Sequence, residues 1–443
     1  MVVVLVGTGL ALTLLLGFVQ IKGFIHAIHV IRGRYDDPND PGEISHFQAL
    51  TTALSATVGL GNIAGVAVAI SAGGPGAVFW MVVTGLVGMA TKYSECSLAV
   101  MYRHVDERGE VHGGPMHYIV RGLGEKWRPL AVFFAFAAIV ASFGAANMFQ
   151  TNQVASVLVR SLPYDENLIK WVTGITLSLL TGMVIIGGIK RIGHVTGILV
   201  PLMGAIYVIG ALIVIVSNIG QVPAVFSSIF SEAFGLNAAA GGVAGGAIRA
   251  LIQGVRRACF SNEAGLGSAP IAHSAASTDE PIREGVVALL EPFIDTVVIC
   301  SMTALVILIS GAHLNSDGVE GVTLTAAAFD TGIPGFGTFF VTTAVVLFAY
   351  STLLSWSYYG ERAVDFLFPG STKSLLIYKG LFCLLAIVGA VWTLGPVLAF
   401  SDIMLGLMVV PNLFAVWMLF PKLRAASKEY FDKLNAGQFT VHK

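Results

Sequence analysis

Long apolar segments constrain this chain more than any other feature of its sequence. A helix that crosses the hydrocarbon core of a bilayer needs about 20 apolar residues, and segments of this length recur along the chain. They lie at residues 2–21, 47–72, 78–101, 130–158, 167–188, 195–217, 236–259, 284–311, 337–360, 374–394 and 396–420. Lipid offers the backbone no hydrogen-bond partners, and the segments lack the ten-residue alternation of barrel strands. The sequence therefore predicts an all-α integral membrane protein with about eleven transmembrane helices.

Composition supports this class and excludes others. Apolar residues make up 55% of the chain and charged residues only 12%, which lies outside the range of soluble domains. A net charge of -1 gives no reason to expect nucleic acid as a partner. The four cysteines lack the spacing of a zinc site or a disulfide framework, so no cofactor is expected. No nucleophile, base and orienting residue cluster at a recognisable spacing, so an enzyme is not expected either.

The basic residues predict how the chain is oriented. If the N-terminus faces outside, most of the 25 Lys and Arg residues fall in cytoplasmic stretches, Arg256 and Arg257 among them. Only Arg160 and Lys170 fall in outer loops. Because cytoplasmic loops carry the excess of Lys and Arg, we expect a multi-pass cell-membrane protein with its N-terminus outside and its C-terminus in the cytoplasm.

The order of the segments indicates an internal repeat. Without the first helix, ten remain, and they divide into runs of five at 47–217 and 236–420. An odd repeat length gives the halves opposite topology, as in transporters whose repeats begin with a broken helix. Glycine-rich stretches lead both runs, "TTALSATVGLGNIAGVA" and "AAAGGVAGGAIRALIQGVRRACFSNEAGLGSAP". The predicted units are an extra N-terminal helix with a cytoplasmic linker (1–45), a first repeat (46–217), a second repeat with an outer connecting segment (218–420) and a cytoplasmic tail (421–443).

The first glycine-rich stretch has a chemical interpretation and a structural one. A glycine in mid-helix costs about 1 kcal/mol relative to alanine, and unbonded peptide groups in lipid cost roughly several kcal/mol each. Amides near Gly59, Leu60 and Gly61 could bind a carboxylate, while the carbonyls of Ser55 and Val58 could bind a hard cation. Close helix packing through a G-x-x-x-G pair explains this stretch alone equally well.

Other polar residues lie at membrane depth. Ser351 and Thr352 offer adjacent hydroxyls for a sodium ion, or bond to carbonyls of their own helix. Asp295 is a cation ligand, a proton carrier or a paired structural carboxylate. Trp356, one turn beyond Thr352, caps a small pocket or simply packs.

Two further groups of polar residues have structural alternatives. Asn147, Gln150 and Thr151 share one helix face, which suits a polar lining or hydrogen bonds between helices. Lys92 and Glu95 are three residues apart on one helix, which favours a structural ion pair. In a predicted cytoplasmic loop, we expect His112 and His117 to have a solvated role among charged neighbours.

Several motifs in order make the chain recognisable. They are "GEISHFQALTTALSATVGLGNIAGVA", "GGPGAVFWM", "GMATKYSE", "GGPMHY", "GGIKRIG", "FSNEAGLGSAPIAHSAA" and "FAYSTLLSWSYYGE". Together they resemble the alanine or glycine:cation symporter family from about residue 40 to 420. The resemblance implies a leucine-transporter-type fold of inverted five-helix repeats and sodium-coupled, sometimes proton-coupled, uptake of alanine or glycine. The chain begins abruptly at its first helix, sooner than the resemblance predicts.

The resemblance also implies roles for individual residues. The amides of Leu60 and Gly61 would bind the substrate carboxylate, and carbonyls at a helix break near Gln253 and Gly254 would bind its ammonium group. The implied substrate-binding residues are Thr57, Gly59, Leu60, Gly61, Asn147, Gln253, Gly254 and Trp356. The implied sodium ligands are Ser55, Thr57, Val58, Asn62, Ser351 and Thr352, with Asp295 as a further candidate.

The expected function is secondary active symport. Sodium entry would drive uptake of a small neutral amino acid, alanine or glycine, by alternating access. The expected partners are this amino acid, sodium as the co-transported ion and the lipid bilayer, and the oligomeric state is left open. A proton-coupled transporter of the same fold, resting on Asp295, and a channel or receptor of similar architecture remain alternatives.

Overall fold

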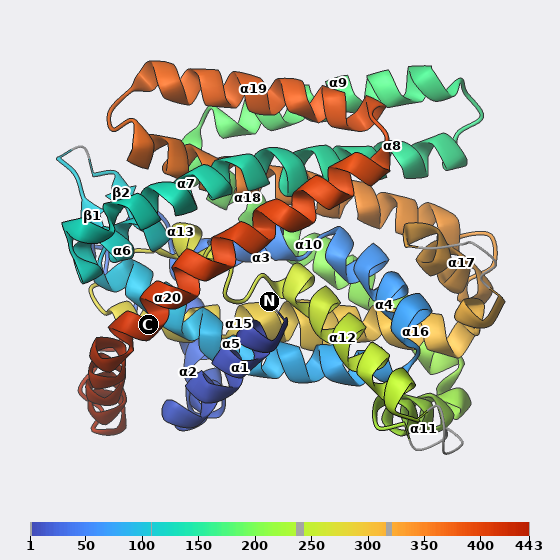
Figure 1. The fold of residues 1–443 in the computed structure, drawn as a ribbon, viewed down its shortest axis with the longest axis horizontal. Helices are drawn as coiled ribbons and strands as arrows, with labels where there is room; N and C mark the ends of the chain where they lie inside the picture. Colours follow the sequence, from blue (N-terminus) through green and yellow to red (C-terminus); the bar gives the residue numbers. More distant parts are fainter. Residues whose placement is uncertain (1, 108, 236–242, 316–320, 443) are drawn as a thin grey trace.

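Helices make up most of the computed structural model, which describes residues 2–107, 109–235, 243–315 and 321–442 (Figure 1). The helices before residue 240 are α1 (Val2–Leu15), α2 (Val19–Ile31), α3 (His46–Thr57), α4 (Val66–Gly73), α5 (Gly76–Met101), α6 (Pro115–Leu123), α7 (Arg128–Phe143), α8 (Phe149–Ser161), α9 (Glu166–Ile185), α10 (Gly188–Ser217) and α11 (Val222–Ala233). Those after it are α12 (Val243–Asn262), α13 (Ala269–His273), α14 (Pro281–Ala288), α15 (Leu290–Pro292), α16 (Ser301–Ser310), α17 (Val322–Gly332), α18 (Gly337–Leu367), α19 (Thr372–Val391) and α20 (Leu394–Asn435).

Short irregular elements join or interrupt these helices. The π-helical turns are η1 (Gly61–Gly65), η3 (Gly144–Met148) and η5 (Phe293–Cys300), and the 3₁₀ turns are η2 (Glu125–Trp127), η4 (Ile219–Gln221) and η6 (Ala312–Asn315). The strands β1 (His104–Val105) and β2 (Val111–His112) form an antiparallel hairpin between α5 and α6. Because π-helical turns often mark functional sites, the three of them direct attention to the helices that they interrupt.

The all-helical membrane class is confirmed. Among the described residues, eight helical segments are long and apolar enough to cross a membrane, or up to ten if two bent pairs count as one span each. The count of about eleven helices stays a prediction, because residues 236–242 of one predicted span lie outside the described part of the chain. The division into a leading helix and two repeats also stays a prediction.

The first predicted span is not a single straight helix. We expected it to cover residues 2–21, but α1 ends at Leu15, and α2 follows at an angle of 81°. Gly17 and Phe18 both have a left-handed backbone, with φ values of 63° and 59°. Because a left-handed residue cannot continue a right-handed helix, the helix must turn here.

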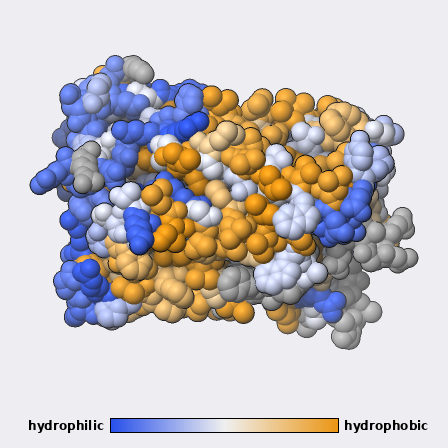
Figure 2. Space-filling model, turned by 90° about the horizontal axis from the view of Figure 1, so that it is seen from above, coloured by the Kyte–Doolittle hydropathy of each residue, from blue (hydrophilic) through white to orange (hydrophobic). Residues whose placement is uncertain are grey.

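The surface has the distribution expected of a membrane protein. Figure 2 shows hydrophilic residues gathered at one end of the molecule and a broad hydrophobic band beside them. The hydrophilic end carries β1, β2, α6 and the C-terminus (Figure 1). Exposed apolar side chains such as Leu179 and Ile186 have 64% and 77% of their surface accessible, which suits contact with lipid chains.

The two glycine-rich segments pack inside the helical array. The first, α3 and α4, contacts α10 and α18 through α3 and α12 through α4. The second, α12, lies along α5. The two segments that the sequence predicts to be broken therefore pack against each other, and α18 packs against the first of them.

Candidate substrate and cation site

The first glycine-rich helix is broken where the sequence predicted it. Helix α3 ends at Thr57, the π-helical turn η1 begins at Gly61, and the axis bends by 51°. Val58, the residue after α3, has a ψ of 89°, which is outside the helical range. The Asn62 side chain replaces one of the hydrogen bonds lost at the break, because its Oδ1 accepts a hydrogen bond from the Gly59 amide at 2.8 Å.

The second break lies further along the chain than predicted. The break expected near Gln253 and Gly254 is wrong, because α12 continues through both residues to Asn262. A Cβ on Gly254 would lie 2.3 Å from the Ala77 carbonyl oxygen, so this glycine permits close packing of α12 on α5. The chain leaves the helix at residues 263–268, where Gly265 and Gly267 have φ values of 92° and 82°.

A small cavity lies between the two breaks. Its volume is ≈ 20 Å³. Its wall includes Ala56, Thr57, Gly59, Leu60, Gly61, Gln150, Phe260, Glu263, Thr352 and Trp356. Five residues predicted to bind substrate therefore meet here, and Trp356 covers one side as expected. Asn147, Gln253 and Gly254 are not among the described residues that line this cavity.

Glu263 is the site residue that sequence reasoning missed. Its backbone is left-handed, with a φ of 54°, which is uncommon for a residue other than glycine. The indole Nε1 of Trp356 donates to one carboxyl oxygen at 3.1 Å, and the Ser268 hydroxyl donates to the other at 2.5 Å. An acid inside the "FSNEAGLGSAP" motif, among glycines and at membrane depth, was the available signal.

The polar face of α8 contributes Gln150 in place of Asn147. The Asn147 amide donates to the Phe382 carbonyl oxygen at 2.6 Å, so it links η3 to α19. Gln150 is buried, lines the cavity, and its Oε1 has no hydrogen-bond partner among the described residues. The π-helical turn η3 begins at Gly144 and changes the register that a regular helix would give. An orphaned buried acceptor beside a cavity suits a ligand that donates hydrogen bonds.

Asp295 lies at the centre of a cluster of oxygen atoms next to the first helix break. Its carboxylate accepts hydrogen bonds from Asn62 Nδ2 at 2.7 Å, Ser261 Oγ at 2.9 Å and Thr296 Oγ1 at 2.7 Å. Asp295, Asn62, Ser261 and Thr296 are all buried. The structure thus brings two predicted cation ligands, Asn62 and Asp295, together with two hydroxyls that had not been predicted.

A second group of oxygen atoms joins α3 to α18. The Ser55 carbonyl accepts from Thr352 Oγ1 at 3.1 Å and from Ser351 Oγ at 3.3 Å. In return, the Ser55 hydroxyl donates to the Ser351 carbonyl at 2.6 Å. Three predicted sodium ligands, Ser55, Ser351 and Thr352, therefore meet. The role of the Val58 carbonyl stays a prediction.

A wider cavity of ≈ 240 Å³ borders the small one. Both are lined by Leu60 and Phe260, and Phe149 packs edge-on against Phe260 with ring centroids 6.2 Å apart. Arg160 and Arg257 line the wider cavity together, so the assignment of these two residues to opposite sides of the membrane is wrong. Arg257 lies in α12 before the second break, on the same cavity as Arg160.

Buried charged residues lie next to the second break. Lys92 Nζ is 2.9 Å from Glu291 Oε1 and 3.9 Å from Glu95 Oε1, which confirms the predicted ion pair and adds a closer partner. Asn412 connects this group to the break, because its Nδ2 donates to Glu95 at 2.7 Å and to the Gly265 carbonyl at 2.8 Å.

The same group continues away from the cavity. His273 lies 3.7 Å from Glu291 through Nε2 and bonds to Glu284 at 2.5 Å through Nδ1. His46 also bonds to Glu284. All of these side chains are fully or almost fully buried. We call the set His46, Lys92, Glu95, His273, Glu284 and Glu291 the buried charge network.

Solved structures define the class of fold. The chain superposes on the crystal structure of MhsT in complex with L-phenylalanine with a TM-score of 0.62, over 87% of this chain and 92% of that one, at 13% sequence identity. The fold is therefore that of the leucine-transporter type.

Sequence comparison then gives the family. The model of the sodium:alanine symporter family matches residues 1–443, and this chain belongs to that family. It is 46% identical to the sodium/alanine symporter AgcS of Methanococcus maripaludis over 95% of this chain and 91% of that protein. It is 35% identical to the probable sodium/glutamine symporter GlnT of Bacillus subtilis over 100% and 90%. It is thus a multi-pass membrane protein of a family of transporters, which are not enzymes.

Proposed function

We propose that this protein couples sodium entry to the uptake of alanine or glycine by alternating access. The observation that carries this proposal is the small cavity between two interrupted helices, which is lined by Trp356 and by Thr57, Gly59, Leu60 and Gly61. Interrupted helices at the interface of two repeats are where transporters of this kind bind solute and ion.

Both charged ends of an amino acid find partners in this cavity. Amides of Leu60 and Gly61 lie at the start of η1, where the positive end of a helical segment favours a carboxylate. The unpartnered Oε1 of Gln150 and the carboxylate of Glu263 both line the cavity and can accept hydrogen bonds, so they suit the ammonium group. These roles replace the one first expected of Gln253 and Gly254.

The size of the cavity favours a small side chain. A volume of ≈ 20 Å³ corresponds to about one water molecule, which needs roughly 10–15 Å³ in this measure. Alanine or glycine would require the cavity to widen, and the longer side chain of glutamine, named for one relative, would require further movement of the bulky Phe260 or Trp356. Asn147 contributes by holding α19 in place and not by direct contact.

Two oxygen clusters are proposed as sodium sites. The first contains Asn62 and Asp295 with the Ser261 and Thr296 hydroxyls, and the Thr57 carbonyl is its expected ligand from α3. The second contains Ser55, Ser351 and Thr352, with the Val58 carbonyl as a further ligand. Carbonyl, hydroxyl and carboxylate oxygens are the ligands that hard cations prefer.

Transport by the purified protein in liposomes tests the proposal. Labelled alanine and labelled glycine should accumulate inside the liposomes against their own concentration gradients when sodium is outside. This uptake should stop when choline replaces sodium. Excess unlabelled glutamine should compete weakly. Uptake that persists in choline and follows an imposed proton gradient would instead favour proton coupling through Asp295, and ohmic current without counterflow would favour a channel.

The proposed orientation has the N-terminus outside and the hairpin end in the cytoplasm. Most basic residues still support this orientation after Arg257 is reassigned. An epitope at the C-terminus should be protected from antibody in intact cells and accessible after permeabilisation. Accessibility in intact cells would reverse the assignment.

A further inference from the structure

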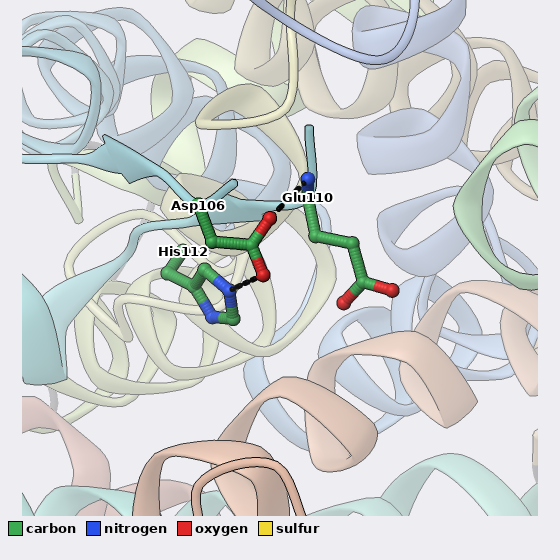
Figure 3. A group of neighbouring side chains, drawn as sticks. All are labelled: Asp106, Glu110 and His112. Atoms are coloured by element: carbon green, nitrogen blue, oxygen red, sulfur yellow. Dashed lines mark hydrogen bonds and ion pairs between the residues drawn. The ribbon is translucent and has the colours of Figure 1, made fainter. Parts of the chain in front are cut away.

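The hairpin between α5 and α6 carries a group of side chains that the proposed transport function does not use. Strands β1 and β2 lie at the hydrophilic end of the molecule (Figure 1), and their residues are not among the described residues that line the small cavity between the helix breaks. They border an open cavity of ≈ 540 Å³, which is also lined by the end of α18. Asp106, Glu110 and His112 contribute to it from the hairpin (Figure 3).

The register of the hairpin brings these three side chains together. His104 pairs with His112, and Val105 pairs with Val111. The turn that follows is closed by bonds from the Asp106 amide to the Glu110 carbonyl at 3.0 Å and from the Glu110 amide to Asp106 Oδ1 at 2.8 Å. One bond joins the two backbones and the other uses the Asp106 side chain, and together they hold Asp106 opposite Glu110.

The donor atoms are close to the spacing of a metal site. One atom from each of Asp106, Glu110 and His112 lies within 4.8 Å of the others, and His112 Nε2 is 3.5 Å from Asp106 Oδ2. Tetrahedral Zn²⁺ with bonds of about 2.0–2.2 Å places its ligand atoms roughly 3.4 Å apart. The His112–Asp106 pair already has this spacing. Glu110 needs to move closer by up to about 1.4 Å to reach this spacing, and its side chain is 51% exposed and able to move.

Asp365 orients the histidine for this role. Its Oδ2 lies 2.9 Å from His112 Nδ1, so one ring nitrogen is engaged and Nε2 faces Asp106. A carboxylate behind a histidine ligand is the usual support in zinc sites, where it fixes the tautomer and the ring orientation. The carboxylate comes from the end of α18, so the hairpin alone could not provide it.

A second histidine packs on His112 outside this group of donors. His104 stacks on His112 with ring centroids 4.8 Å apart and an interplanar angle of 19°. Its Nδ1 is buried and has no hydrogen-bond partner among the described residues. One cation competes for Glu110, because Arg362 Nη1 lies 3.6 Å from its carboxylate.

We propose that Asp106, Glu110 and His112 form a binding site for Zn²⁺, with Asp365 as the orienting carboxylate. One imidazole and two carboxylates suit a first-row transition metal better than a purely oxygen-binding ion such as Mg²⁺. The ion would join the two sides of the hairpin tip and, through His112 and Asp365, hold the α5–α6 connection against α18.

Metal binding to the purified, tag-free full chain tests this proposal without reference to transport. Zn²⁺ titrated by calorimetry should bind at one ion per chain, and Co²⁺ should give the visible absorption of a tetrahedral nitrogen–oxygen site. His112→Ala and Glu110→Gln should each weaken binding at least tenfold. Asp365→Asn should weaken it roughly 10–100-fold, as loss of an outer carboxylate does.

Two controls keep the result interpretable. His194→Ala removes an exposed histidine elsewhere on the chain and should leave binding unchanged. Each variant should elute from size exclusion as the unaltered protein does. Glu110→Gln is the variant least able to disturb the fold, because its side chain is half exposed. Equal Zn²⁺ affinity in the unaltered protein, His112→Ala and Glu110→Gln would overturn the proposal, as would loss of binding in His194→Ala.

Discussion

Replacing Gly59 by alanine tests whether the first helix break and the second oxygen cluster depend on each other. A Cβ at this position would lie 2.9 Å from Thr352 Oγ1, which is closer than normal contact. That hydroxyl is held by bonds to the carbonyls of Ser55 at 3.1 Å and Phe348 at 3.0 Å. To make room for the methyl group, this hydroxyl or the backbone at residue 59 must shift, which disturbs the bond to Ser55 in the proposed sodium site.

The size of the effect follows from these contacts. Loss of one hydrogen bond costs about 1 kcal/mol, and an extra methyl group in a packed interior costs about 1–3 kcal/mol. If these costs destabilise the cation-bound form by about 2 kcal/mol relative to the cation-free form, sodium affinity drops roughly 30-fold, since every 1.4 kcal/mol is a factor of about ten. The sodium concentration for half-maximal alanine uptake should rise by that factor.

Gly65→Ala is the matched control, because it makes the same change six residues later, in η1, where nothing lies within 4 Å of the added methyl group. Its sodium dependence should stay within about twofold of the unaltered protein. The assay is initial uptake of labelled alanine in liposomes over a range of external sodium. The reasoning fails if Gly59→Ala keeps a normal sodium dependence or if Gly65→Ala is impaired to the same degree.

Three other changes probe separate parts of the structure. Glu263→Gln should raise the KM for alanine roughly 10–100-fold, because bonds to charged groups contribute about 1.5–3 kcal/mol; an unchanged KM would remove Glu263 from the substrate site. Lys92→Met should lower the Tm of the purified protein, because Glu291 loses its cationic partner in the interior at a cost of about 3–5 kcal/mol. Adding Glu291→Gln should restore part of the lost Tm. An unaltered Tm in Lys92→Met would contradict the stabilising role of this ion pair. Asp365→Asn should lower the pKa of His112, because the Asp365 hydrogen bond is the main reason that this pKa is raised; NMR of labelled histidine would detect the shift, and an unmoved pKa would refute the cause.

The first break could be predicted from sequence and the second could not, for a physical reason. A glycine serves two purposes that look alike in a sequence, namely close approach of another backbone and a left-handed conformation. Gly254 serves the first, against the Ala77 carbonyl, whereas Gly265 and Gly267 serve the second. Only the spatial neighbours of each glycine distinguish these cases.

The side chains around the cavity show a similar limit. The hydroxyls of Ser351 and Thr352 could be placed because α18 is a regular helix through this region. Asn147 and Gln150 could not be ranked, because η3 alters the helical register just before them. Glu263 could have been suspected from its type and depth, but its direction depends on the positive φ of its backbone.

The buried charge network has a consequence for how the protein is made. The α5 span has a mean hydropathy of only 1.2, and Lys92 lies in it, a residue that costs about 2.5–3.5 kcal/mol at the centre of an inserting helix. Its closest counter-charge, Glu291, is synthesised about 200 residues later, which takes roughly 10–40 s at ribosomal speed. During that interval α5 is poorly suited to lipid on its own. We therefore expect α5 to stay at the translocon, or beside an insertion chaperone, until α15 has been synthesised and Glu291 can neutralise Lys92.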